Sequence, residues 1–224
     1  MAKTISVLMV ATGAARMSNG EATGVWLEEF AVPYLAFRDA GYEVVVATPT
    51  GGEVPVDPRS VEEREEWREA LAALAVSVPL GEVVAGDFDA IFLPGGHGVM
   101  FDLADNTELA RALRQLDEKE RVISAVCHGP AALAGATRAD GTPLVAGRRI
   151  TGFTNAEEEA AGHTAKMPFL LESRLRELGA EFIPDDDWAN HVEVDGRLIT
   201  GQNPQSTAAV ARAVIAALGT APLP

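Results

Sequence analysis

Four short apolar runs stand out in the first part of the chain. They lie at residues 5–11 (ISVLMVA), 42–47 (YEVVVA), 89–93 (DAIFL) and 121–126 (RVISAV). The first lacks the apolar and polar alternation of a half-solvated strand, and the second is rich in β-branched residues. Continuous apolar runs of this kind are typical of strands buried on both faces of a parallel sheet. We therefore predict these four segments as strands of such a sheet.

Segments with apolar residues at helical spacing lie between these runs. Residues 27–40 are one such segment, which ends at a glycine suited to the position after a helix. Pro33 within it predicts a kink or a restart, because proline has no N–H donor. Residues 106–118 are a second helix, with Asn106 or Thr107 as its cap.

The chain continues with further strands and helices. Residues 48–60 are rich in Pro and Gly and predict a long loop, and residues 61–74 predict a charged amphipathic helix, so that an insertion of about 48–80 lies beside the main sheet. The remaining predicted elements are a helix from Gly129, a strand over 149–153, a helix over 169–178, strands near 180–183 and 192–200, the last of them a hairpin that turns at Asp195-Gly196, and a helix over 206–218. This alternation predicts an α/β fold, a doubly wound, mostly parallel sheet in a single domain over residues 1–224.

The charge and the cysteine content narrow the class of protein. With 33 acidic and 18 basic residues the formal net charge is -15, which repels nucleic acid and anionic membrane surfaces. The single cysteine cannot form an internal disulfide, and no apolar run approaches the roughly 20 residues that span a bilayer. We therefore expect a cytoplasmic protein that binds neither nucleic acid nor membranes.

The single cysteine, Cys127, follows the strand predicted at residues 121–126. Ala125 and Gly129 lie two positions to either side of it, and small residues there permit a sharp strand-to-helix turn that exposes a nucleophile. A following helix N-terminus is expected to lower the pKa of the thiol, and the backbone N–H of His128 can bind an oxyanion. Taken alone, a free cysteine is more often a small buried hydrophobic residue. The polar and conformationally special residues after Cys127 favour a functional thiol.

A second glycine-rich turn, PGGHG at residues 94–98, follows another predicted strand. An N–H of Gly95 or Gly96 could complete an oxyanion hole opposite His128. Phosphate binding is not expected, because the Gly-Lys-Ser/Thr pattern of the phosphate-binding loop is absent. The four histidines, at positions 97, 128, 163 and 191, show no metal-ligand spacing, so we expect no metal and no cofactor.

Two adjacent carboxyls, Glu28 and Glu29, open the helix at residues 27–40. Glu28 is interpreted as a charge that complements the helix dipole. Glu29 could point back over the sheet towards the thiol, where burial would raise its pKa and let it carry a proton at neutral pH.

Four motifs occur in register: PGGHG, AVCHGP, TGFTNAEEE and LITGQNPQS. Together they resemble the PfpI-like members of the class I glutamine amidotransferase-like superfamily, which also contains the parkinsonism-associated deglycase. The resemblance covers nearly the whole chain. TGVWLEEFAVPY, PTGGEVPVDPRS and residues 201–204 are most similar to the glyoxalase III-type branch, whose members are also described as heat-shock chaperones.

The resemblance implies a flavodoxin-like sandwich, a homodimer and a set of site residues. Cys127 would be the nucleophile, His128 its base and Glu29 the buried acid beside the thiol. In that branch a carboxylate after the TGF motif orients the histidine, and matching the segment places this role on Glu158. The neighbouring carboxyls Glu157 and Glu159, and Asn155 in the same segment, remain alternatives.

The pair His191 and Glu193 has the spacing that a glutaminase uses, but both residues fall on the predicted hairpin, so we do not expect glutamine hydrolysis. The predicted function is instead the cofactor-free conversion of methylglyoxal, a small aldehyde, and water to lactate through Cys127. Alternatives with the same cysteine are a stress-responsive chaperone or redox sensor, and a protein deglycase or peptidase. The identity of the substrate remains open at this point.

Overall fold

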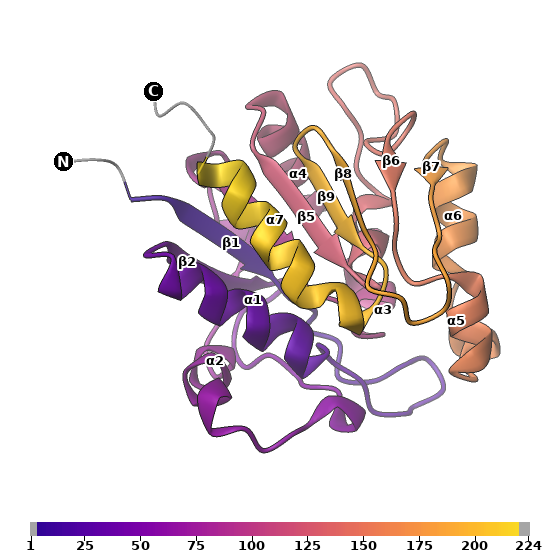
Figure 1. Ribbon diagram of the computed structural model, residues 1–224, viewed down its shortest axis with the longest axis horizontal. Helices are drawn as coiled ribbons and strands as arrows, with labels where there is room; N and C mark the ends of the chain where they lie inside the picture. Colours follow the sequence, from indigo (N-terminus) through magenta and orange to yellow (C-terminus); the bar gives the residue numbers. More distant parts are fainter. Residues whose placement is uncertain (1–3, 220–224) are drawn as a thin grey trace.

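The computed structural model describes residues 4–219 and places a seven-stranded sheet at the centre of the molecule (Figure 1). The strand order is β3-β2-β1-β4-β5-β9-β8, and every pair is parallel except β8 with β9. The bounds are β1 (Ser6–Val10), β2 (Glu43–Thr48), β3 (Val78–Pro79), β4 (Ala90–Leu93), β5 (Val122–Val126), β8 (Val192–Asp195) and β9 (Leu198–Gly201). The predicted doubly wound, mostly parallel α/β sheet and its terminal hairpin are confirmed.

Helices cover both faces of this sheet. Their bounds are α1 (Leu27–Asp39), α2 (Arg68–Leu74), α3 (Val99–Asp102), α4 (Thr107–Glu118), α5 (Asn155–Ala160), α6 (Leu171–Glu177) and α7 (Thr207–Gly219). Helices α1 and α7 pack against each other in front of the sheet in Figure 1, and α4 packs behind it. The Asn106 side chain accepts a hydrogen bond from the Leu109 N–H at 2.9 Å, so Asn106 is the predicted cap of α4.

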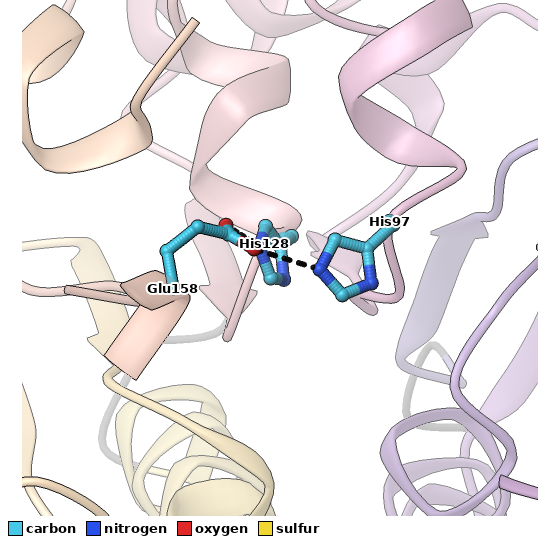
Figure 2. A group of neighbouring side chains, drawn as sticks. All are labelled: His97, His128 and Glu158. Carbon is cyan, nitrogen blue, oxygen red and sulfur yellow. Dashed lines mark hydrogen bonds and ion pairs between the residues drawn. The ribbon is translucent and has the colours of Figure 1, made fainter. Parts of the chain in front are cut away.

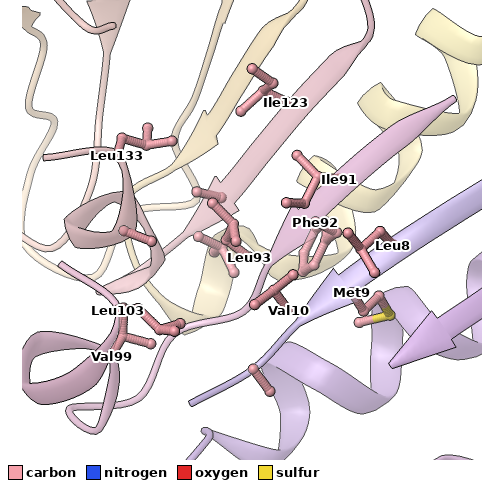
Figure 3. Close-up of a cluster of buried hydrophobic side chains, with 14 of the residues drawn as sticks. Leu8, Met9, Val10, Ile91, Phe92, Leu93, Val99, Leu103, Ile123 and Leu133 are labelled. Carbon is pink, nitrogen blue, oxygen red and sulfur yellow. The ribbon is translucent and has the colours of Figure 1, made fainter. Parts of the chain in front are cut away.

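The core lies on the three central strands. Leu8 and Met9 of β1, Ile91 and Phe92 of β4 and Ile123 of β5 are all buried, and Figure 3 shows them side by side. Each such side chain contributes on the order of 1.5–3 kcal/mol relative to an exposed one. The burial explains why the apolar runs predicted these strands correctly. No helix within residues 4–219 has both the length and the apolar character that membrane spanning requires.

Several predicted elements are shorter than expected. The helix predicted over 61–74 forms only at 68–74, because the charged residues 62–66 have no apolar side to bury, whereas Ala70 and Leu74 are buried. The helix predicted from Gly129 is a 3₁₀ turn over 129–133. The strand predicted over 149–153 is reduced to β6 (Arg149–Ile150), which pairs with β7 (Glu181–Phe182) in a separate two-stranded sheet.

The expected restart at Pro33 does not occur. Helix α1 runs through this residue, and Pro33 is buried together with Phe30, Tyr34 and Phe37 on the same helix. Packing of this apolar side offsets the hydrogen bond that proline cannot donate.

Candidate active site

Cys127 follows β5 directly and has a backbone φ of 60°. The left-handed region is strained for a residue with a Cβ, so the surroundings must hold it there. The Cys127 N–H donates to the Gly201 carbonyl at 3.0 Å, and the Phe153 N–H donates to the Cys127 carbonyl at 2.8 Å. A Cβ on Gly129 would lie 2.2 Å from the Leu93 carbonyl oxygen, which explains the glycine after the turn. The predicted sharp turn is therefore present.

Cys127, His128 and Glu158 form a continuous line of contacts. The Cys127 Sγ lies 3.4 Å from His128 Nδ1, and His128 Nε2 lies 2.7 Å from Glu158 Oε2. All three side chains are buried. A neutral His128 that donates from Nε2 to the carboxylate leaves Nδ1 free to accept the thiol proton.

Among the four candidates in the segment after the TGF motif, Glu158 is the residue that contacts His128. Glu157 is buried but accepts hydrogen bonds from other partners, including the Trp188 N–H. Glu159 is exposed, and the Asn155 side chain donates to Ser173. The capping box of α5, formed by Thr154 and Glu157, fixes the helix start that points these carboxyls to different neighbours.

A second histidine, His97, shares the Glu158 carboxylate (Figure 2). Its Nε2 lies 3.0 Å from Glu158 Oε1, and its ring centroid lies 4.2 Å from that of His128. Its Nδ1 lies 3.0 Å from the Arg59 guanidinium. Because an arginine can only donate, Nδ1 accepts, and the proton of His97 is on Nε2 where it is donated to Glu158.

The electrostatics agree with this assignment. Burial, together with the neighbouring His128, lowers the pKa of His97 to about 4, so His97 is neutral at pH 7. Burial by itself would raise the pKa of Glu158, but the hydrogen bonds from His128 and His97 outweigh it and hold this pKa well below its usual range. Glu158 is therefore a stable anion beside His128.

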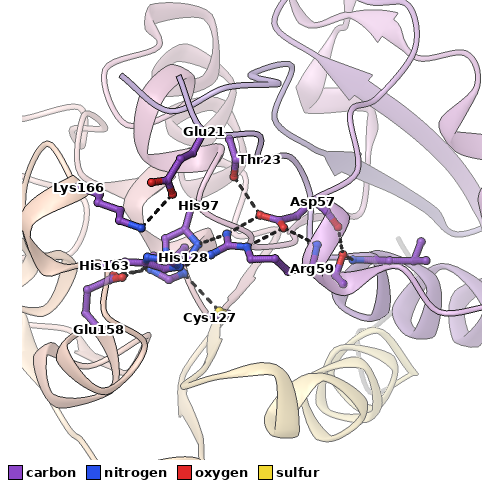
Figure 4. A network of polar contacts seen from close by, with 12 residues as sticks. Glu21, Thr23, Asp57, Arg59, His97, Cys127, His128, Glu158, His163 and Lys166 are labelled. Carbon is purple, nitrogen blue, oxygen red and sulfur yellow. Dashed lines mark hydrogen bonds and ion pairs between the residues drawn. The ribbon is translucent and has the colours of Figure 1, made fainter. Parts of the chain in front are cut away.

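Arg59 reaches this cluster from the segment between β2 and α2 (Figure 4). Its guanidinium donates to both oxygens of the buried Asp57, at 2.9 Å and 2.6 Å, and also contacts His163. Thr23 donates a further hydrogen bond to Asp57 at 3.1 Å. The sequence gives no role to His97 or Arg59, because their contacts join distant positions. His97 contacts Glu158, 61 residues away, and Arg59 contacts His97, 38 residues away.

Glu29 lies on the first turn of α1 and is completely buried. Its Oε2 accepts a hydrogen bond from the Gly95 N–H at 2.8 Å. Burial raises the pKa of Glu29 to about 8, and interactions with Cys127 and with the Gly95 N–H reduce this effect only in part. Glu29 is therefore predominantly protonated at neutral pH and can donate a proton near the thiol.

The expectation that the thiol pKa is lowered is wrong. Burial, followed by the neighbouring Glu29, raises the pKa of Cys127 well above its ordinary value, and the His128 N–H lowers it only in part. The physical reasons are that the thiol is enclosed beside a carboxyl and that only a short 3₁₀ turn follows it. Cys127 therefore rests as a thiol and needs a base to activate it.

Of the three predicted oxyanion donors, Gly95, Gly96 and His128, one already donates to a carboxyl. The Gly95 N–H already donates to Glu29, so it is engaged in this arrangement. Gly96 lines the pocket with a φ of 95°, and a Cβ there would lie 2.3 Å from the Gly24 carbonyl oxygen, so close backbone packing requires a glycine. Gly96 and His128 are the backbone positions left to bind an oxyanion.

A pocket of about 130 Å³ lies over the thiol. Its polar side contains Arg59, Gly96, His97, Cys127, His128 and His163, and its apolar side contains Trp26, Phe153, Ala161, Trp188 and Pro204. A pocket of this size and character suits a small molecule with one reactive polar group.

The same cluster contains the types of side chain that bind metal ions. One ligand atom each of His97, His128 and Glu158 lies within 4.8 Å of the others, a grouping that could hold a divalent metal ion. The sequence spacing did not reveal it, because the three residues follow three different strands and loops. In the structure both imidazoles hydrogen-bond to the carboxylate.

A family model described as the DJ-1/PfpI family matches residues 22–217. The chain therefore belongs to the DJ-1/PfpI family, and the predicted resemblance is confirmed. Among its relatives is glutathione-independent glyoxalase hsp3101 of Schizosaccharomyces pombe, which is 33% identical and aligns over 88% of each chain.

Two solved structures extend the similarity. Glyoxalase III from Candida albicans is 33% identical, with a TM-score of 0.87 over 95% of this chain and 97% of that chain. Rapid Encystment Protein 24 KDa from Francisella tularensis is 35% identical, with a TM-score of 0.92 over 96% of this chain and 99% of that chain.

Proposed function

We propose that this protein is a cofactor-independent glyoxalase III-type enzyme that converts methylglyoxal and water to lactate. The observation that carries the proposal is the position of the Cys127 thiol, between a histidine base paired with an anion and a protonated carboxyl. The names of hsp3101 and of the Candida albicans protein support it.

The first step forms a covalent adduct. His128 Nδ1 accepts the thiol proton, and the sulfur adds to the aldehyde carbon, so that an S–C bond forms and the carbonyl oxygen becomes an alkoxide. The N–H groups of Gly96 and His128 would stabilise this alkoxide, which then takes the proton from His128 and gives a neutral hemithioacetal. Glu158 stabilises the transient imidazolium.

The second step moves a hydrogen between the two carbons. His128 removes the proton from the former aldehyde carbon while Glu29 protonates the ketone oxygen, which gives an enediol. His128 then protonates the second carbon, and the hydroxyl at the first carbon returns a proton to Glu29, which leaves a thioester of lactate. The raised pKa of Glu29 favours this division, in which His128 is the base and Glu29 the acid.

The last step hydrolyses the thioester. His128 takes a proton from water, the hydroxide adds to the thioester carbonyl, and the C–S bond breaks as the sulfur regains its proton. The sum is one methylglyoxal and one water converted to one lactate, with no cofactor consumed.

The direct test is lactate formation from methylglyoxal by the purified protein without added thiol, compared with the variants Cys127→Ser and Cys127→Ala. We expect loss of turnover by about 10⁴-fold or more, as is usual when a nucleophile is removed. Equal turnover by either variant would overturn the proposal.

The alternative functions use the same cysteine. A pocket of about 130 Å³ favours a small aldehyde over a peptide. Suppression of aggregation that is unchanged in Cys127→Ala would support an additional chaperone role, independent of the chemistry. The homodimer and the cytoplasmic location remain predictions.

A further inference from the structure

Trp188 is a large aromatic residue in an unfavourable place. It lies in the loop between β7 and β8, is 42% exposed, and has a φ of 64°. A bulky residue in the left-handed region is an outlier that persists only where the surroundings hold it. Neither burial nor backbone preference explains a tryptophan here, so a role in the pocket that it lines is the simplest account.

A buried carboxylate holds the backbone of this residue. Glu157 Oε1 accepts the Trp188 N–H at 2.8 Å, together with the side-chain amides of Gln202 at 3.2 Å and Asn203 at 2.8 Å. Its Oε2 accepts the Thr154 N–H at 3.0 Å. Glu157 is completely buried. Four hydrogen bonds to one carboxylate thus fix the loop to the start of α5, next to Glu158.

The side chain of Trp188 continues an aromatic wall that begins at the catalytic histidine. The rings of His128 and Phe153 have centroids 4.4 Å apart, and those of Phe153 and Trp188 are 5.6 Å apart at 64°. Trp26 and Pro204 also line the pocket. Edge-to-face contacts of this kind keep Phe153 and Trp188 in a defined arrangement.

We propose that Trp188 is a specificity-determining residue, which selects 2-oxoaldehydes with an apolar or aromatic substituent on the ketone carbon. This inference rests on the proposed function. With the aldehyde carbon at Cys127, the ketone substituent is the part of the substrate left to contact the aromatic wall. Phe153, Trp188, Trp26 and Pro204 give this side of the pocket an apolar lining, which suits an apolar substituent. Phenylglyoxal is the matching probe, and glyoxal, which has only hydrogen at that position, is the reference.

The experiment measures kcat and KM for glyoxal, methylglyoxal and phenylglyoxal with the wild type, Trp188→Ala and Trp188→Phe. We expect Trp188→Ala to raise KM for phenylglyoxal by about 10- to 100-fold, since lost apolar contact of this size has that effect on discrimination. KM for glyoxal should change by less than about threefold, and kcat should stay within about threefold, because the contact is uniform between ground and transition states. Trp188→Phe should restore part of the loss.

Two controls separate the side chain from the backbone. Trp188→Gly removes the same side chain but relieves the strain at a φ of 64°, so it should match Trp188→Ala in the substrate pattern. Val76→Ala removes apolar surface at a residue that is 77% exposed and lies outside the pocket, and it should match the wild type.

The outcomes distinguish the two proposals. A Trp188→Ala variant with unchanged constants for phenylglyoxal, or with equal losses of kcat for all three substrates, would overturn the specificity role and leave the glyoxalase function standing. A wild type without turnover on any of the three would overturn the proposed function itself, and the specificity role with it.

Discussion

Two buried carboxyls, Glu29 beside Cys127 and Glu158 beside His128, have different charge states. Glu29 accepts a hydrogen bond from a single backbone N–H, and burial raises its pKa to about 8. Glu158 accepts hydrogen bonds from two imidazoles, which hold its pKa well below the usual range. The difference shows that the number and kind of donors, rather than burial alone, decide which carboxyl is an acid and which an anion.

The fold supplies the two environments from different places. Glu29 lies at the start of α1 under the turn that follows β4, both parts of the central sheet and its covering helices. Glu158 lies on α5, which follows β6 and is outside the seven-stranded sheet. The protonated carboxyl thus belongs to the central part of the fold, whereas the anionic carboxyl lies on a segment outside the main sheet.

Among changes to the two carboxyls and their contacts, the largest effect is expected when Glu158 is neutralised. Glu158→Gln keeps the size of the side chain but cannot stabilise the His128 imidazolium, and its amide places a donor against an imidazole N–H. We expect kcat/KM for methylglyoxal to fall by about 10²- to 10⁴-fold, the usual contribution of a positioned acid–base group. Initial rates of lactate formation measure it.

Glu159→Gln is the matched control, because Glu159 is the next residue on α5 and is exposed. Its kcat/KM should equal that of the wild type. A Glu158→Gln variant that keeps more than about a tenth of wild-type kcat/KM would contradict the anionic role, because a positioned acid–base group contributes about 10²-fold or more.

An intermediate effect concerns stability against pH. The folded-state pKa of Glu29 is raised from 4.5 to about 8, so between these values the native state binds more protons than the unfolded state, and stability falls as pH rises. Glu29→Gln removes this dependence. Relative to the variant, we expect the wild type to lose up to about 1.4 kcal/mol of unfolding free energy per pH unit over that window. Urea unfolding at pH 5, 6, 7 and 8 tests the difference.

Glu53→Gln serves as the control for this series, because Glu53 is exposed. Its stability difference from the wild type should stay flat over the same pH range. If the unfolding free energy of the wild type does not fall relative to that of Glu29→Gln between pH 5 and pH 8, Glu29 is already ionised in the folded protein at pH 5.

The smallest effect is expected at His97, whose Nε2 contacts Glu158. His97→Gln can keep a donor near the Nε2 position, whereas His97→Asn is too short to reach Glu158. We expect His97→Asn to lower kcat by about tenfold, the scale of one hydrogen bond to a charged group, with KM unchanged, and His97→Gln to retain most of kcat. Equal kcat values in the two variants would contradict a role through the Glu158 hydrogen bond.

The sequence predicted the parts of the molecule in which local pattern decides structure. The runs that became β1, β4 and β5 are buried throughout, and the Cys127 turn is marked by small residues beside it. The two-residue strands β6 and β7 were not delimited, since their pairing depends on tertiary contacts.

Local sequence pattern and tertiary contacts also divided the site residues that could be predicted from those that could not. Glu29 could be proposed from its place at the start of a helix, whereas Glu158 was selected only by the resemblance, with Glu157, Glu159 and Asn155 as alternatives that the residues alone did not exclude. His97 and Arg59 carry no local signal of their contacts, which the folded chain creates between distant loops.

The left-handed backbone at Cys127 sets the stability of the folded protein against the proposed reactivity of the thiol. At a φ of 60° glycine is the residue that the backbone itself prefers, so Cys127→Gly would relieve strain while it removes the proposed nucleophile. Selection for stability alone would therefore favour glycine over cysteine at this position. Under the proposed function, the reactivity of the thiol accounts for a side chain that the backbone at the end of β5 does not favour.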